Sequence, residues 1–225
     1  MSFGFQTKNE SGFVTVDADY RNLVLREKVS GTFTTQQIWY GLVRLDIDRA
    51  QITITNATNP ICFIYTNAAA AFVEINITGS TYTWTITSNT NGNFTAYIFD
   101  VPITIGDGHG IKVYDQSAEL VFDSENKYMK VVDYFSLVIK QGTEPNVDTV
   151  RTYNNIGTYA VGVSNPNGGY VPRYDLIQLN GISCSPTSIT IRDRLVLDSI
   201  QAVDGMGEMF APATVPYMVI DVTGY

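Results

Sequence analysis

The chain is poor in charge and has very few cysteines. Only 16% of its 225 residues are charged, and 22 acidic residues outnumber 14 basic ones, so the formal net charge is −8. Phosphate backbones attract clustered Lys and Arg, so this balance argues against a nucleic-acid partner. Cys62 and Cys184 are too few for a disulfide framework or, on their own, for a zinc site. We expect two buried free thiols.

Long apolar runs are also missing. No stretch approaches the roughly 20 apolar residues that a membrane helix requires. Residues 1–6 lack the basic region and the continuous apolar region of a secretory signal. We therefore expect a protein that is made in a cytoplasm, is not exported by the usual route and does not insert into a membrane.

Catalytic signatures are scarce. His109, the single histidine, lies in a glycine-flanked loop, and nothing near it resembles a nucleophile elbow. Asp46 with Asp48 and Glu119 with Asp123 could suggest glycoside hydrolysis, which needs two carboxylates roughly 5–10 Å apart. Solvated strand edges and turn caps explain both pairs more simply. The sequence predicts no catalytic residue, no metal site and no cofactor, and a β-sandwich hydrolase is the least favoured of three alternatives.

The dominant pattern is that of β-strands. Apolar and polar residues alternate along residues 52–55, 73–78 and 82–87, so one face of each predicted strand is apolar. Asn-Gly dipeptides at 91–92 and 180–181 favour tight hairpin turns. No window of 12 residues shows a helical apolar stripe. The predicted fold class is therefore all-β, built as antiparallel β-sandwiches.

The most informative feature is an internal repeat. Residues 4–25 match residues 110–131 without a gap, at an offset of 106 positions. Each copy reads as a short strand, a tight turn that Asn9 or Asp115 can cap, and a return strand that ends in an aspartate. The predicted unit is a β-hairpin followed by a crossover.

A second match supports the first. Residues 97–101 resemble residues 218–222 at an offset of 121, so each unit closes with a similar apolar strand. We predict two tandem antiparallel β-sandwich domains related by internal duplication. The N-terminal domain would span residues 1–105 and the C-terminal domain residues 106–225.

The repeated hairpin has a similar pattern of residues in both halves of the chain. The second copy reads Gly110-Ile111-Lys112-Val113-Tyr114-Asp115, then Val121-Phe122-Asp123-Ser124, then Met129-Lys130-Val131-Val132-Asp133. The first copy is similar in Ser2-Phe3-Gly4-Phe5, Asn9 and Gly12. This hairpin resembles one that recurs in small tail-module proteins of tailed phages (siphophages). The second copy departs from the pattern at Ala118, where glycine is expected. The resemblance covers about 25 residues at the head of each half and a handful at each end.

This resemblance implies a non-enzymatic structural component of a phage virion, at the tail tip or associated with a tail fibre. Such a protein is made in the host cytoplasm and then resides in the virion tail. The resemblance also implies a homo-oligomer, with a trimer as the expected symmetry, and other tail proteins as partners. The N-terminal domain would dock on the tail, and the C-terminal domain would face outward, towards a host surface glycan or protein.

Exposed aromatic and methionine side chains are the candidates for these contacts, because such groups adapt to a partner surface. Trp39 and Tyr40 follow a polar run and are candidates for an interface. The other candidates lie in glycine-containing loops of the second half: Tyr170, Met206, Met209 and Phe210.

Aromatic residues also support an alternative function. Trp39 and Tyr40, together with Tyr65, Tyr82 and Trp84, could form a sugar-stacking platform, so the runner-up prediction is a carbohydrate-binding β-sandwich module. For Trp84, packing in a core is the simpler expectation, because it shares one strand face with other apolar residues.

Overall fold

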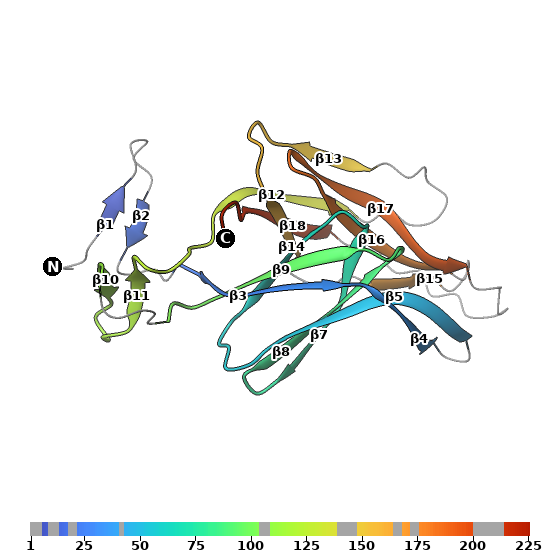
Figure 1. The fold of residues 1–225 in the computed structure, drawn as a ribbon, viewed down its shortest axis with the longest axis horizontal. Coiled ribbons are helices and arrows are strands. Elements are labelled where there is room, and N and C mark those ends of the chain that lie inside the picture. Colours follow the sequence, from blue (N-terminus) through green and yellow to red (C-terminus); the bar gives the residue numbers. More distant parts are fainter. Residues whose placement is uncertain are drawn as a thin grey trace.

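The computed structural model describes residues 6–8, 14–17, 22–40, 43–103, 109–138, 148–163, 168–171, 176–199 and 214–225. Strands in this part pair antiparallel, in two large sheets that pack together and in two small hairpins (Figure 1). The predicted all-β sandwich is confirmed. Among the described residues, no helix is long and apolar enough to cross a membrane.

The first large sheet has six strands. In spatial order they are β12 (Val131–Val138), β18 (Thr214–Asp221), β14 (Tyr159–Val163), β6 (Ile61–Thr66), β9 (Asn93–Asp100) and β3 (Val24–Thr32). β12 and β3 therefore form its two edges.

The second large sheet has eight strands. In spatial order they are β13 (Thr149–Thr152), β17 (Ser188–Ser199), β16 (Leu176–Cys184), β7 (Ala70–Thr78), β8 (Thr81–Ser88), β5 (Val43–Ile54) and β4 (Thr34–Tyr40), with β15 (Gly168–Val171) also paired to β16.

The main core lies between these sheets and follows from the alternation in the sequence. Ile52 and Ile54 of β5 and Trp84 and Ile86 of β8 are buried in it, while the polar residues between them take the other strand face. The six-stranded sheet contributes alternate residues of β6, β9 and β18, among them Ile64.

The two halves of the chain share both sheets. In the six-stranded sheet β14 pairs with β6 through Val161 and Ile64, and in the eight-stranded sheet β16 pairs with β7 through Ile182 and Ala70. We call this junction the seam. The boundary predicted between residues 105 and 106 therefore does not separate two sandwiches, because the described strands form one sandwich whose main core comes from both halves. Each half alone would leave two unpaired sheet edges at the seam, and unpaired edges promote pairing.

The halves nevertheless follow the same strand order. From the seam outwards, the six-stranded sheet reads β6-β9-β3 in the first half and β14-β18-β12 in the second. β3 shifts its register against β9 between Leu25 and Glu27, and β12 shifts against β18 between Val131 and Asp133. These shifts lie 106 positions apart, as in the sequence repeat. The internal duplication itself is not confirmed and stays a prediction.

The two hairpins lie at one end of the molecule, outside both sheets (Figure 1). β1 (Gln6–Lys8) pairs with β2 (Val14–Asp17), and β10 (Lys112–Tyr114) pairs with β11 (Leu120–Asp123). Both pairs shift register after their second residue, again at positions 106 apart. The repeated motif therefore forms the same local structure twice.

A second apolar cluster anchors the hairpin end of the sandwich. It lies on the six-stranded sheet and includes the buried residues Phe63 and Phe99. The segments that lead out of the hairpins meet beside it, where Val24 bridges to Tyr128, and Leu23 and Met129 pack against the cluster. Leu23 and Val24, which follow the first hairpin, and Tyr128 and Met129, which follow the second, therefore lie side by side at this end of the sandwich.

Candidate functional site

The predicted contact residues lie mostly beyond what the structure describes. Trp39 and Tyr40 belong to β4, and Tyr170 belongs to β15, but their side chains are outside the described part. The remaining three are outside the described residues altogether: Met206, Met209 and Phe210. No geometry links these six residues into one site.

Trp84 is part of the core and not of a surface platform. Its side chain is 3% exposed, and the ring of Tyr82 stacks on it with the centroids 6.2 Å apart. The hydroxyl of Tyr82 donates to the carbonyl of Thr58 at 2.8 Å. Core packing of Trp84 is therefore confirmed, and a sugar-stacking surface built on it is excluded because stacking needs an exposed ring face.

The second hairpin shows how the repeated motif folds. The Asp115 carboxylate accepts the N–H groups of Ser117 and Glu119, both at 2.8 Å, which confirms the predicted turn cap. Ala118 has φ +61°, the left-handed conformation that favours glycine. Ala118, where the sequence pattern leads one to expect glycine, therefore adopts a glycine-type backbone conformation.

Asp123 closes this hairpin. Its buried carboxylate accepts the N–H of Glu125 at 3.0 Å and lies 3.3 Å from the ammonium of Lys112 on the opposite strand. The Phe122 ring stacks on Tyr128, with centroids 4.9 Å apart. A two-stranded hairpin is marginal on its own in water, so these contacts explain how it persists outside the sandwich. Asp123, one member of the acidic pair considered for glycoside hydrolysis, therefore has a structural role in this hairpin.

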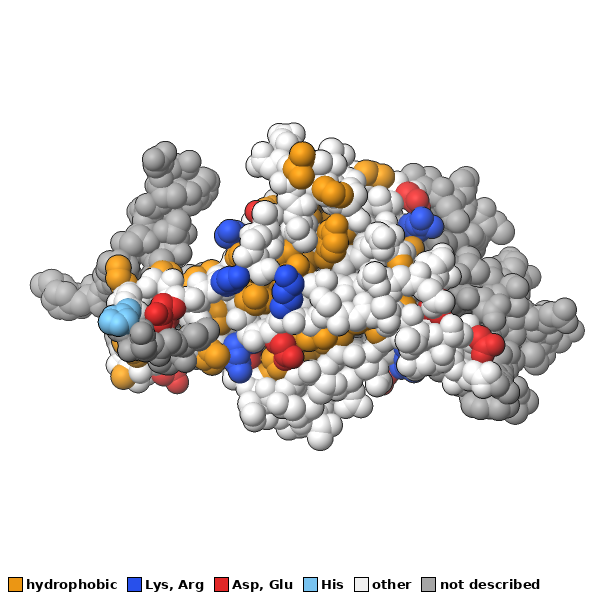
Figure 2. Space-filling view, viewed as in Figure 1, with side chains coloured by type: hydrophobic (Ala, Val, Ile, Leu, Met, Phe, Trp, Pro, Cys, Tyr) orange, Lys and Arg blue, Asp and Glu red, His pale blue; other side chains and the backbone are white. Residues whose placement is uncertain are grey.

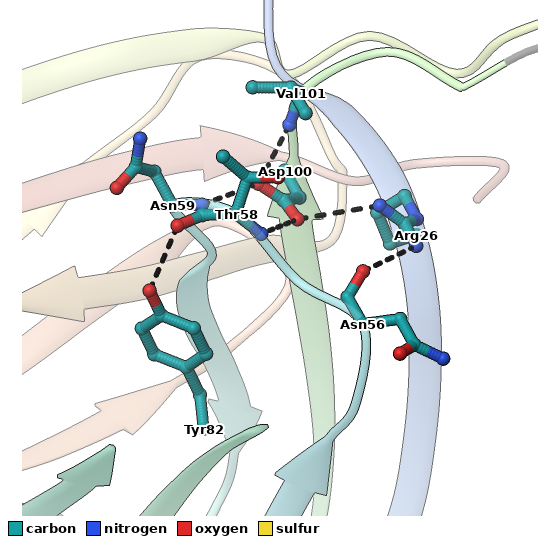
Figure 3. Close-up of polar contacts among 7 residues, drawn as sticks. All are labelled: Arg26, Asn56, Thr58, Asn59, Tyr82, Asp100 and Val101. Atoms are coloured by element: carbon teal, nitrogen blue, oxygen red, sulfur yellow. Dashed lines mark hydrogen bonds and ion pairs between the residues drawn. The ribbon is translucent and has the colours of Figure 1, made fainter. Parts of the chain in front are cut away.

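Asp100 is a fully buried acidic side chain with several hydrogen-bond partners (Figure 3). Its buried carboxylate accepts the N–H groups of Thr58 at 2.8 Å, Asn59 at 2.9 Å and Val101 at 2.8 Å. The guanidinium of Arg26 lies 3.4 Å away and also donates to the carbonyl of Asn56. Asp100 therefore fixes the loop between β5 and β6, and its acceptor sites are filled by the protein itself.

That loop leads to an apolar pocket of about 250 Å³ at the seam. Pro60 and Ile61 line it from the first half, and Tyr134 and Met218 line it from the second. Pockets for drug-sized ligands usually measure about 300–1,000 Å³, so this one lies just below that range.

The buried thiols do not supply a nucleophile. Cys62 lines the pocket, and burial raises the pKa of its thiol, while burial raises the pKa of Cys184 to about 12. Both cysteines are buried and free, as predicted, and both stay protonated at neutral pH, whereas the reactive species is the thiolate. In the described part of the chain, no group of three His, Cys, Asp or Glu side chains could hold a metal ion.

The exposed apolar side chains of β12 were not predicted from the sequence. β12, at an edge of the six-stranded sheet, exposes Val132, Tyr134 and Val138. Figure 2 shows apolar side chains gathered over β12 and the neighbouring β13. The sequence does contain a sign of this exposed apolar strand: residues 131–138 include only one charged residue in eight and do not alternate cleanly between apolar and polar.

Comparisons with protein-family models, with curated proteins and with solved structures give no match to this chain.

Proposed function

We propose that this chain is a non-enzymatic structural protein of a phage virion, located at the distal tail and acting through assembly with neighbouring proteins. The observation that carries the proposal is the repeated hairpin. The motif that resembles phage tail-module proteins forms a separate small sheet in each half, and both copies lie at the same end of the molecule (Figure 1).

The hairpin end is the part that docks on the tail. The second hairpin exposes Ile111 and Tyr114, so it offers apolar side chains as well as a strand edge with which no other described strand pairs. Because the two halves lie side by side within one sandwich, docking belongs to this end of the molecule and not to the first half alone. The opposite end then faces away from the tail and is the region for contact with a host surface glycan or protein.

The interior chemistry supports a structural role. The buried carboxylates of Asp100 and Asp123 hold a loop and a hairpin in place, and the buried thiols are protonated at neutral pH. A low surface charge lowers the desolvation cost of burying the surface against a neighbour. These features favour assembly with copies of the chain and with other tail proteins over turnover of a substrate.

The test is quantitative mass spectrometry of purified virions from a phage that encodes the chain. We expect the chain at a fixed copy number per particle, retained in isolated tails and missing from tailless heads. Presence in the lysate but absence from tails contradicts the proposal. Glycan binding by the isolated chain, combined with that absence, would favour the carbohydrate-binding module instead.

A further inference from the structure

We infer that the free edge of β12 is the surface through which a second copy of this chain binds, by antiparallel pairing of β12 with β12 of the other copy. This inference rests on the proposed function and deepens it by naming a partner and a surface, and it gives a two-fold pair in place of the trimer that the resemblance implies. β12 pairs with β18 on one side only, and no described strand pairs with its other side. An eight-residue strand with one open side is a ready template for another strand.

The side chains of β12 are unusual for an open edge. Val132, Tyr134 and Val138 are 46%, 62% and 56% exposed, although all three are large and apolar. Phe135 is buried in the main core and Leu137 packs against it, so Tyr134 and Val138 point to the opposite face. Exposed apolar side chains on an open edge favour pairing with another chain.

The other edge of the same sheet provides an internal comparison. β3 lies at the matching place in the first half, with the same register shift against its neighbour. At the positions 106 residues before Val132, Tyr134 and Val138, β3 has Arg26, Lys28 and Thr32. Charged side chains are a common protection of sheet edges. Arg26 is held in its ion pair with Asp100, but Lys28 and the adjacent Glu27 are exposed. The β3 edge therefore carries exposed charge, whereas the β12 edge carries exposed apolar side chains.

Charge on the β12 edge allows two copies to approach. The chain as a whole carries −8, so copies repel unless the contact surface is locally neutral. Asp133, the single charged residue of β12, lies 4.0 Å from Arg151 of β13 and accepts a hydrogen bond from Tyr153 at 3.3 Å. The Arg151 guanidinium also lies 4.6 Å from the centre of the Phe135 ring. The edge is thus apolar and close to neutral.

A second copy is the favoured occupant because the chain already joins equivalent strands in this way. β6 and β14 occupy matching places in the two halves and pair antiparallel across the seam, as do β7 and β16. Pairing β12 with β12 about a two-fold axis repeats that arrangement between two molecules and extends the six-stranded sheet across both copies. Tyr134 and Val138 of each copy then cover those of the other.

The first test makes the β12 edge resemble the β3 edge. The triple variant Val132→Arg, Tyr134→Lys and Val138→Thr carries the residues that β3 has at the matching positions, so it is designed to fold. Sedimentation velocity of the full chain at micromolar concentrations should show a dimer for the unchanged chain and association at least about tenfold weaker for the variant, because charged and polar side chains replace the apolar ones that pairing would bury. The matched control, Ser30→Lys with Thr32→Lys on β3, should associate like the unchanged chain.

The second test locates the axis by disulfide cross-linking. Cysteines are placed singly at four exposed positions of β12: Val132, Tyr134, Ser136 and Val138. In an antiparallel pair only residues next to the axis approach their own counterpart within the about 7 Å Cα separation that a disulfide allows. We expect rapid cross-linking at one position or at two neighbouring ones, with Ser30→Cys on β3 as the negative control.

The outcomes separate this inference from the proposed function. A chain that is monomeric at tens of micromolar, a β3-like variant that associates as well as the unchanged chain, or cross-linking as fast at Ser30→Cys as on β12 overturns the β12 interface. None of these results depends on whether the chain is found in tails. A chain that pairs through β12 but is absent from virions refutes the phage assignment and leaves the interface standing.

Discussion

Replacing Asp100 should show how much one buried carboxylate contributes to the sandwich. In Asp100→Ala the N–H groups of Thr58, Asn59 and Val101 lose their acceptor, and Arg26 loses its ion-pair partner. An unsatisfied buried donor costs about 1–3 kcal/mol, and removing one partner of a buried ion pair costs about 3–5 kcal/mol. Water can reach part of the 56–59 loop, where Asn56 and Asn59 are exposed, so we expect a total loss of about 3–5 kcal/mol in the free energy of unfolding.

The second half contains the matched control. Asp221 lies 121 positions after Asp100 at the end of the corresponding strand, but it is only partly buried and accepts one backbone N–H, that of Thr223 at 2.9 Å. Asp221→Ala should therefore cost about 1 kcal/mol. Urea unfolding followed by circular dichroism measures both variants, and Asp100→Asn, which keeps one acceptor oxygen, should fall between them. Equal losses for the two alanine variants, or a loss below about 1 kcal/mol for Asp100→Ala, would refute the role given to this carboxylate.

Two further predictions concern the hairpin and the thiols. Ala118→Gly should relieve the left-handed backbone at φ +61° and stabilise the second hairpin by about 1 kcal/mol, which would slow hydrogen exchange of its amides about fivefold; unchanged or faster exchange would contradict this. Burial raises the pKa of Cys184 from its ordinary value of 9.0 to about 12, so the stability linked to this thiol is fully present below pH 9 and is lost as the pH rises towards 12. Thiol-reagent titration at pH 8 should therefore label neither cysteine until urea unfolds the chain, and fast labelling of the folded protein would show that the thiols are accessible.

Local structure could be predicted from the sequence because its causes are local. Alternation placed Ile52, Ile54 and Trp84 in the core, and the Asp115 cap formed where an aspartate precedes a tight turn. The offset of 106 read from the hairpins also relates the register shifts of β3 and β12. The sequence match alone does not require the two register shifts to lie at the same offset, because each shift depends on pairing with a strand about 75–90 residues further along the chain.

The joining of the halves could not be predicted, because alternation defines the faces of a strand and not its neighbours. β14 and β6 pair through Val161 and Ile64, about 100 residues apart in the chain, and no residue pattern marks either strand as the partner of the other. The open edge at β12 was missed for the same reason: Val132 and Tyr134 become an exposed edge only once the strand order is known. The six predicted contact residues lie outside the described side chains, so they remain predictions.

A reconstruction of the assembled phage tail by electron cryomicroscopy tests the central claim most directly. The account predicts density for this sandwich at the distal tail, with the end that carries both hairpins against the tail and at least about 1,000 Å² of surface buried against neighbouring chains. A distal tail without this sandwich, or one in which the chain buries well under about 1,000 Å² against any neighbour, would contradict it.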